Sequence, residues 1–351
     1  MRRRIEWIDL VKAVSVLLVV FMHASNTLVD LAGPSGVTAV LQHINHLLEP
    51  MRMPVFFLVS GMLASSAVHR PWSKSGNRTL GMVYLYLVWM LLFFGFITVF
   101  GSAPSDPVSS ILFAKSGFWY LYAMALFFVI ARLLRNQPAW VVVAVALLPN
   151  ILRPLTDQVV GQLVPGSLYT SMAMNLAFFL IGAYFKDIVG GLAEKVTTWH
   201  AMVFGALSVT AGLLWLDTPE MVGQSLLPLS LLWVPFGVSV AVLVTRDGAP
   251  AWSKYVGART LSIYVMQWPV IFLLGTFLPG GLLAHPVVAL VFPFAVTAAV
   301  AALALWLHSL PALRSLFVAP RWVTHPHELP FFASLRPQAP APEPVTVTAG
   351  R

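Results

Sequence analysis

Long apolar segments recur along this chain, and they limit its fold more than any other feature of the sequence. A helix of about 20 apolar residues crosses the hydrocarbon core of a bilayer. Hydrophobic residues make up 58% of the 351 residues and charged residues only 10%. Soluble domains carry about a quarter charged residues. We therefore expect an all-α integral membrane protein.

The segments predict about ten transmembrane helices. They lie near residues 8–29, 53–69, 80–100, 117–134, 138–152, 168–186, 198–216, 225–245, 260–278 and 286–308. The fifth segment is shorter than the others. The residues 1–318 are thus expected to form one polytopic membrane domain, and residues 319–351 a Pro-rich, disordered cytoplasmic tail.

Basic residues are distributed unequally between the two sets of loops. With the N-terminus in the cytoplasm, the cytoplasmic side receives most of them: Arg70, Lys74, Arg78, Arg132, Arg135, Lys186, Lys195, Arg246, Lys254, Arg259, Arg314 and Arg321. The outer side receives Arg52, Lys115 and Arg153. Since cytoplasmic loops carry an excess of Lys and Arg, both termini are predicted to be cytoplasmic, N-in and C-in.

Charge and cysteine content exclude several other classes. The net charge of +8 comes from basic residues that stand singly between apolar segments, which is typical of membrane loops and not of a nucleic-acid-binding face. The chain has no cysteine, which excludes disulfides, thiolate metal sites and a cysteine acyl relay. We expect no metal.

The first segment carries three ionisable residues on one stripe. Lys12 and His23 point in almost the same direction at about 100° per residue, and Asp9 lies close to that direction. Ionisable groups inside a membrane face protein or a water-filled cavity. Lys12 and His23 are roughly 16 Å apart along the helix axis, so they cannot pair. This spacing suits a long anionic ligand that lies along the helix.

Each of these residues has two interpretations. A neutral imidazole can remove the proton from an attacking hydroxyl, so His23 is the candidate general base; it can equally be a histidine that only bonds a neighbouring helix. Lys12 can contact the phosphates of a cytoplasmic cofactor, or it can extend to the interface or pair with Asp9.

Further polar residues follow on the outer side. Arg52, before an apolar run, can bind an anionic acceptor or anchor at the headgroups. His43 and His46 lie in Val37–Leu48, which we expect to be an interfacial or re-entrant helix; they either line the acceptor's entrance or form a wet helix face. Gln267 is an amide inside the ninth segment and needs partners.

Five blocks, in this order, resemble the acyltransferase 3 family of integral-membrane acyltransferases, in particular its sugar O-acetylase-like branch. They are Ile8-Asp9 with Lys12 and His23, the stretch 53–61 (MPVFFLVSG), 118–121 (FWYL), 178–182 (FFLIG), and 261–269 with Tyr264 and Trp268-Pro269. Two positions differ from the family pattern: Gln267 stands where histidine is common, and Arg52 stands where that branch often has histidine.

The resemblance implies an O-acyltransferase of the bacterial cytoplasmic membrane. It would move an acyl group, commonly acetyl, from acetyl-CoA or another acyl-CoA to a hydroxyl of a cell-envelope glycan, a glycolipid or a secreted small molecule. His23 would be the base and Lys12 would help to hold CoA, with Asp9 orienting Lys12. Arg70 and Arg78 would raise the local anion concentration, and Arg52, His43, His46 and Gln267 would contact the acceptor.

A transporter or flippase for a glycan or lipid precursor is the competing class. Ten spans with polar residues near the midplane fit such a carrier as well. Labelling of an acceptor that depends on acetyl-CoA distinguishes the two classes.

Overall fold

The computed structural model describes residues 5–101, 106–166, 168–217 and 226–325, and these residues form helices and no strand. The longer helices are α1 (Glu6–Ala32), α2 (Gly36–Val68), α3 (Trp72–Phe100), α5 (Trp119–Leu133), α6 (Ala139–Ile151), α8 (Tyr169–Tyr184), α10 (Thr198–Leu216), α11 (Leu227–Val244), α13 (Thr260–Phe277) and α15 (Pro286–Ser309). The shorter ones are α4 (Pro107–Leu112), α7 (Arg153–Leu163), α9 (Lys186–Glu194), α12 (Ala251–Gly257), α14 (Gly280–Leu283), the 3-10 helix Pro311–Leu316, and α16 (Arg321–Thr324).

A helix lies in each of the ten predicted segments, so the all-α membrane fold is confirmed. Within the described residues, seven helices are long and apolar enough to cross a membrane: α1, α2, the Ser75–Phe100 part of α3, α10, α11, α13 and α15. The bent pairs α6–α7 and α8–α9 raise the number to nine if each pair forms one span. The remaining one of the ten predicted segments contains α5, which is a shorter apolar helix. The number of spans and the side of the termini therefore stay predictions.

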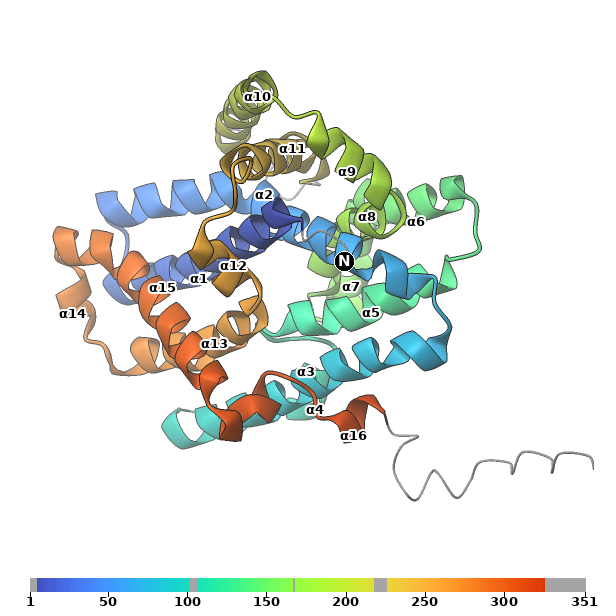
Figure 1. The fold of residues 1–351 in the computed structure, drawn as a ribbon. Coiled ribbons are helices and arrows are strands. Elements are labelled where there is room, and N and C mark those ends of the chain that lie inside the picture. The colour runs from blue at the N-terminus through green and yellow to red at the C-terminus, as the bar shows by residue number, and fades with distance from the viewer. Residues whose placement is uncertain (1–4, 102–105, 167, 218–225, 326–351) are drawn as a thin grey trace, which may run out of the picture.

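Helix α1 lies in the middle of the bundle (Figure 1). It packs against α2, α11, α12, α13 and α15. This position follows from its sequence, because Val16, Val20, Ala24 and Leu28 recur at helical spacing and are buried. Within the polar stripe of α1, Asp9 is buried and Lys12 and His23 are partly buried, in keeping with the cost of exposing charge to lipid.

Helix α2 is longer than the second apolar segment from which it was predicted. Residues 37–48 do not form a separate helix but the first turns of α2, which begins after a capping box between Ser35 and Thr38. Pro50 and Pro54 lie inside α2. The helical turns before Pro50 therefore share one helix with the second apolar segment.

The crossing of α2 and α8 depends on two glycines. A Cβ atom on Gly61 would lie 2.1 Å from the carbonyl oxygen of Phe179, and one on Gly182 would lie 2.0 Å from that of Leu58. The two backbones thus meet where neither helix has a side chain, as at small-residue interfaces in membranes. The small residues Ser60-Gly61 on α2 thus permit the close packing of the two helices.

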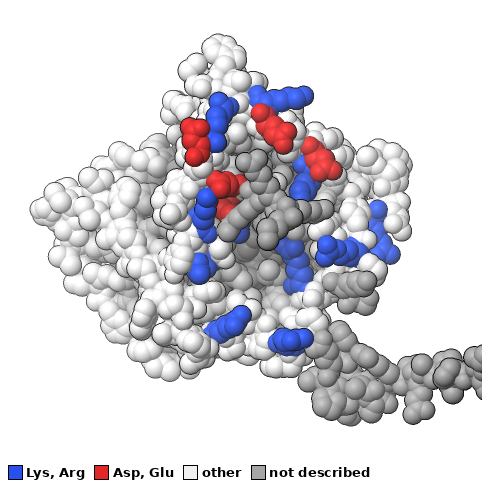
Figure 2. All heavy atoms as spheres, in the orientation of Figure 1, with Lys and Arg blue, Asp and Glu red and all other residues white. Residues whose placement is uncertain are grey.

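The start of α1 lies on the face that carries α9, α12 and α16 (Figure 1). Glu6 pairs with Lys254 of α12 at 2.7 Å and accepts a hydrogen bond from the backbone N–H of Ala249. Figure 2 shows Lys and Arg side chains spread over this face. The basic residues of the predicted cytoplasmic loops therefore gather on one side of the bundle.

The predicted tail begins within the described residues. Arg321–Thr324 forms α16, and Trp322 packs edge-on against Tyr84 of α3 with ring centroids 6.1 Å apart. Residues 326–351 lie outside the described residues, so the disorder predicted for them stays a prediction.

Candidate active site

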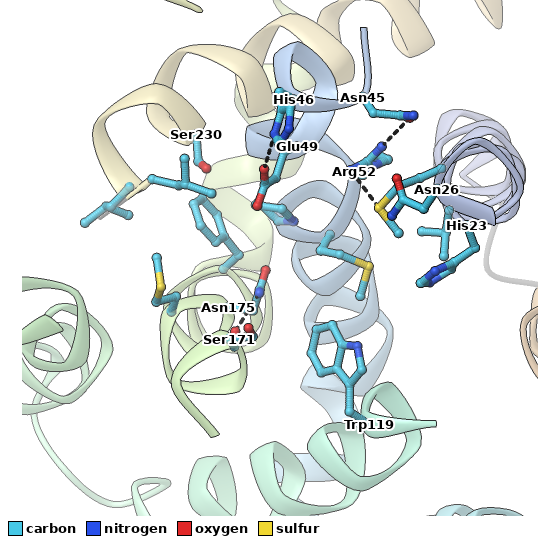
Figure 3. Close-up of a pocket in the computed structure, with 18 of the residues that line it drawn as sticks. His23, Asn26, Asn45, His46, Glu49, Arg52, Trp119, Ser171, Asn175 and Ser230 are labelled. Carbon is cyan, nitrogen blue, oxygen red and sulfur yellow. Dashed lines mark hydrogen bonds and ion pairs between the residues drawn. The ribbon is translucent and has the colours of Figure 1, made fainter. Parts of the chain in front are cut away.

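A cavity of about 410 Å³ opens between two walls of the bundle (Figure 3). One wall is the second half of α1 with the first half of α2, and the other consists of the first turns of α8 and α11. The first residue of α5, the end of α6 and the start of α7 complete it. The cavity therefore lies at the other end of α1 from the Glu6–Lys254 pair.

His23 lines this cavity, as the sequence led us to expect of a candidate base. Its ring lies against the indole of Trp268 on α13, with centroids 4.5 Å apart and planes inclined by 57°. Within the part of the chain that the structure describes, its ring nitrogens form no hydrogen bond. A nitrogen lone pair is thus available to a guest in the cavity.

Trp268 reaches His23 because residue 117 is glycine. A Cβ atom on Gly117 would lie 1.7 Å from the indole of Trp268. The hydroxyl of Tyr264, one turn earlier on α13, donates to the carbonyl of Gly117 at 2.6 Å and accepts from the N–H of Tyr120 at 3.1 Å. The loop before α5 is thereby fixed beneath the tryptophan.

Arg52 also lines the cavity, and its side chain is only 4% exposed. It donates from Nη1 to the amide oxygen of Asn45 at 3.1 Å and from Nη2 to the sulfur of Met22 at 3.1 Å. No carboxylate among the described residues lies within salt-bridge distance of it. A buried cation therefore lines the cavity with neutral hydrogen-bond partners, and the carboxylate of Glu49 interacts with it only from beyond salt-bridge distance.

His46 lies in the same wall and His43 does not. His46 is 3.5 Å from the carboxylate of Glu49, and both residues line the cavity. The ring of His43 is exposed and bonds the carbonyl of Ala39 at 2.7 Å. His46 therefore lines the cavity, whereas His43, about one turn earlier on α2, is exposed outside the cavity lining.

The opposite wall combines apolar residues such as Met174 and Phe178 with polar side chains that the sequence analysis did not single out as candidates. It contains neutral amide and hydroxyl side chains together with one cation: Asn150, Ser171, Asn175, Ser230 and Arg153. Arg153 pairs with Asp157 at 3.2 Å. The available signal in the sequence was a single polar residue within or next to an apolar run.

The remaining predicted residues lie away from the cavity. Asp9, Lys12, Arg70 and Arg78 are absent from its described lining. Asp9 is buried, Arg70 is exposed, and Arg78 donates to the carbonyl of Leu63 at 3.1 Å. The structure thus brings together His23, Arg52 and His46 but not the residues predicted to hold the donor.

Gln267 is fully buried outside the cavity lining. Its amide oxygen and nitrogen have no hydrogen-bond partner among the described residues. The structure therefore does not place this predicted acceptor contact at the cavity.

No group of three or more His, Asp or Glu side chains within the described ranges is arranged to hold a metal ion. The side chains that line the cavity can transfer protons at His23, His46 and Glu49 and can bind anions and hydroxyl groups.

The chain is similar to one known protein family and to a membrane protein of known sequence. The family described as an acyltransferase domain matches residues 5–307. An inner membrane protein of Escherichia coli, YcfT, is 23% identical over 308 residues, which cover 75% of this chain and 79% of YcfT. No solved structure matches the chain.

Proposed function

This chain belongs to the acyltransferase domain family, and from that membership we propose that it is an O-acyltransferase of the bacterial cytoplasmic membrane. It transfers an acyl group, acetyl in the simplest case, from acyl-CoA to a hydroxyl of a cell-envelope glycan, a glycolipid or a secreted small molecule. The observation that carries the proposal is His23, whose ring nitrogens form no hydrogen bond with the described residues, in a cavity that also holds Arg52 and several amide and hydroxyl side chains.

The proposed step needs one base and one aligned hydroxyl. His23 takes the proton as the acceptor oxygen attacks the thioester carbonyl carbon. A C–O bond forms and the C–S bond breaks, and the proton on His23 passes to the departing thiolate of CoA. Trp268 holds the imidazole in place, while Asn150, Ser171, Asn175 and Ser230 supply hydrogen bonds for the other hydroxyls of the acceptor.

The donor is proposed to approach from the basic face in Figure 2. Lys12 lies about 16 Å from His23 along α1, so a cation at that level suits the phosphates of CoA when the thioester is at the imidazole. Asp9 would orient Lys12, and Arg70 and Arg78 would attract the anionic donor at the surface. His43 and Gln267 lie outside the cavity lining, so we no longer propose a direct acceptor contact for them.

His23→Ala tests the proposal most directly. We would purify the protein into nanodiscs and supply radiolabelled acetyl-CoA with an envelope extract from cells that lack the gene. General-base catalysis is worth about 10²- to 10⁴-fold, so labelling of the extract should fall by at least about 100-fold.

The matched control is His285→Ala, which removes an exposed histidine at the start of α15. It should label the extract like the wild type. If His23→Ala also retains full labelling at equal protein level, His23 is not the base; if wild-type protein never labels the extract, the transporter class is favoured.

Lys12→Ala tests the donor route. Removal of the cation should raise the apparent KM for acetyl-CoA by about tenfold, the usual scale of one charged contact, with a smaller change in kcat. Initial rates at varied acetyl-CoA measure this. An unchanged KM would contradict the assignment of Lys12 to the donor phosphates.

A further inference from the structure

Two arginines of the bundle are buried but differ in their partners. Arg132 on α5 is 8% exposed, and its Nη1 donates to the carbonyls of Ala67, Val68 and Arg70 and to the hydroxyl of Ser75. The guanidinium of Arg132 also lies over the ring of Trp72, 5.2 Å from its centroid. The hydrogen bonds of its Nη1 and the contact with Trp72 thus hold the guanidinium of Arg132 at the end of α2.

Arg52 is more deeply buried and has fewer partners. Among the described residues it meets one amide oxygen and one thioether sulfur, although a guanidinium carries five N–H donors. Taking an ion out of water costs several kcal/mol unless charge or hydrogen bonds compensate. The site around Arg52 therefore has capacity for an anion.

The side chains nearest to Arg52 do not occupy the position of an anion beside its guanidinium. Asn45, 5% exposed, uses its oxygen for Arg52, while its Nδ2 has no partner among the described residues. Glu49 is the carboxylate one turn before Arg52, but it lies beside His46 and outside salt-bridge distance of Arg52. Guanidinium and amide together offer several N–H donors at one corner of the cavity (Figure 3).

We propose that the acceptor is anionic, and that Arg52 with the Nδ2 of Asn45 binds its phosphate or carboxylate group beside His23. This inference rests on the proposed function and names its substrate class. The donor cannot supply this anion, because the pantetheine arm separates the phosphates of CoA from the thioester that must reach His23. Guanidinium binds carboxylate and phosphate through paired, charge-assisted hydrogen bonds.

The opposite wall fits the rest of such an acceptor. Arg153 is already paired with Asp157, so the polar groups that remain there are neutral amides and hydroxyls, which lie among apolar residues such as Met174 and Phe178. The volume of about 410 Å³ lies within the range of small-molecule sites. The acceptor is therefore oriented with its charged group at Arg52 and its hydroxyl groups toward α8 and α11.

Binding of matched sugars tests the inference without catalysis. Wild-type protein in nanodiscs is titrated by calorimetry with glucose, glucuronate and glucose 6-phosphate at low and high salt. We expect at least one of the two anions to bind about tenfold or more tighter than glucose, with a preference that decreases in salt. Glucuronate and glucose 6-phosphate report the carboxylate and the phosphate separately.

Two variants locate the preference at Arg52. Arg52→Gln should lose it, whereas Arg135→Gln, which changes an exposed arginine on the basic side, should keep it. Asn45→Asp places a carboxylate where an oxygen already lies 3.1 Å from Arg52. It should also lose the preference while its melting temperature stays equal or rises, so that loss of binding cannot be attributed to unfolding.

The outcomes separate this inference from the proposed function. Equal binding of all three sugars by the wild type, or a preference that survives in Arg52→Gln or Asn45→Asp, would overturn the anionic acceptor; the first result would be expected if Arg52 served only the transient oxyanion. Acyl transfer that depends on His23 would stand in either case. Conversely, an anion preference without acyl transfer would support the Arg52 site and refute the enzyme.

Discussion

At the scale of single residues, the placement of His23 depends on a residue that never touches it. Its imidazole lies against Trp268, and the indole in turn occupies the space where a side chain at position 117 would be. The sequence shows Gly117 only as a glycine before an aromatic cluster. Three segments far apart in the chain thus fix the orientation of one ring.

Gly117→Ala should therefore reduce activity without acting on the chemistry directly. The new methyl group must displace the indole of Trp268, and a misplacement of about 1 Å near a reacting group can cost 10²-fold in rate. We expect kcat to fall by about 10- to 100-fold, and the fluorescence of the tryptophans to change. Labelling by acetyl-CoA and emission spectra measure both.

The matched variant is Gly95→Ala on α3, where a Cβ atom meets nothing within 4 Å. It should leave kcat and emission unchanged. Wild-type kcat in Gly117→Ala would show that Trp268 does not position His23.

At the scale of elements, the α2–α8 crossing sets the distance between the two walls of the cavity. Arg52 and Phe178 both line the cavity, and α2 and α8 meet backbone to backbone at Gly61 and Gly182. A wider separation of the helices would move the neutral wall away from Arg52. Small residues in a membrane helix permit such a crossing, but the partner helix is known only from the structure.

Gly61→Ala should destabilise the bundle. The added Cβ would lie 2.1 Å from a backbone carbonyl that cannot rotate away, and overpacking of this kind costs about 1–3 kcal/mol. The apparent melting temperature in detergent should fall. Gly190→Ala on α9, where nothing lies within 4 Å, should melt at or above the wild-type temperature because alanine favours helix. Equal melting of Gly61→Ala and wild type would contradict the tight crossing.

At the scale of the whole molecule, the basic residues of distant loops meet on one face. α9, α12 and α16 lie on the same side as the start of α1, and Lys and Arg side chains are scattered over that side together with some Asp and Glu (Figures 1 and 2). The positive-inside rule predicts that this face is cytoplasmic. The cavity, at the other end of α1, would then receive its acceptor from outside.

Cysteine accessibility tests this orientation, since the chain has no cysteine of its own. Asp247→Cys, in the exposed turn after α11, should react with a membrane-impermeant maleimide only after the cells are permeabilised. Gly281→Cys, in α14 at the opposite end, should react in intact cells. The reverse pattern would place the N-terminus outside and contradict the proposed route of donor and acceptor.

The sequence by itself determined the fold class, the places of the ten helices and the presence of His23 and Arg52 as candidates, because lipid forces apolar segments into helices and makes each polar exception conspicuous. Only the tertiary structure decided which polar residues share a cavity. Asn150, Arg153, Ser171 and Ser230 join His23, whereas His43 and Gln267 do not, although all six looked alike as single polar residues next to apolar runs. The physical reason is that a cavity is made where helices distant in the chain meet. How closely they meet depends on contacts between such segments, as of Gly61 with the backbone of α8 and of Gly117 with the indole of Trp268, and no periodicity within one helix encodes these contacts.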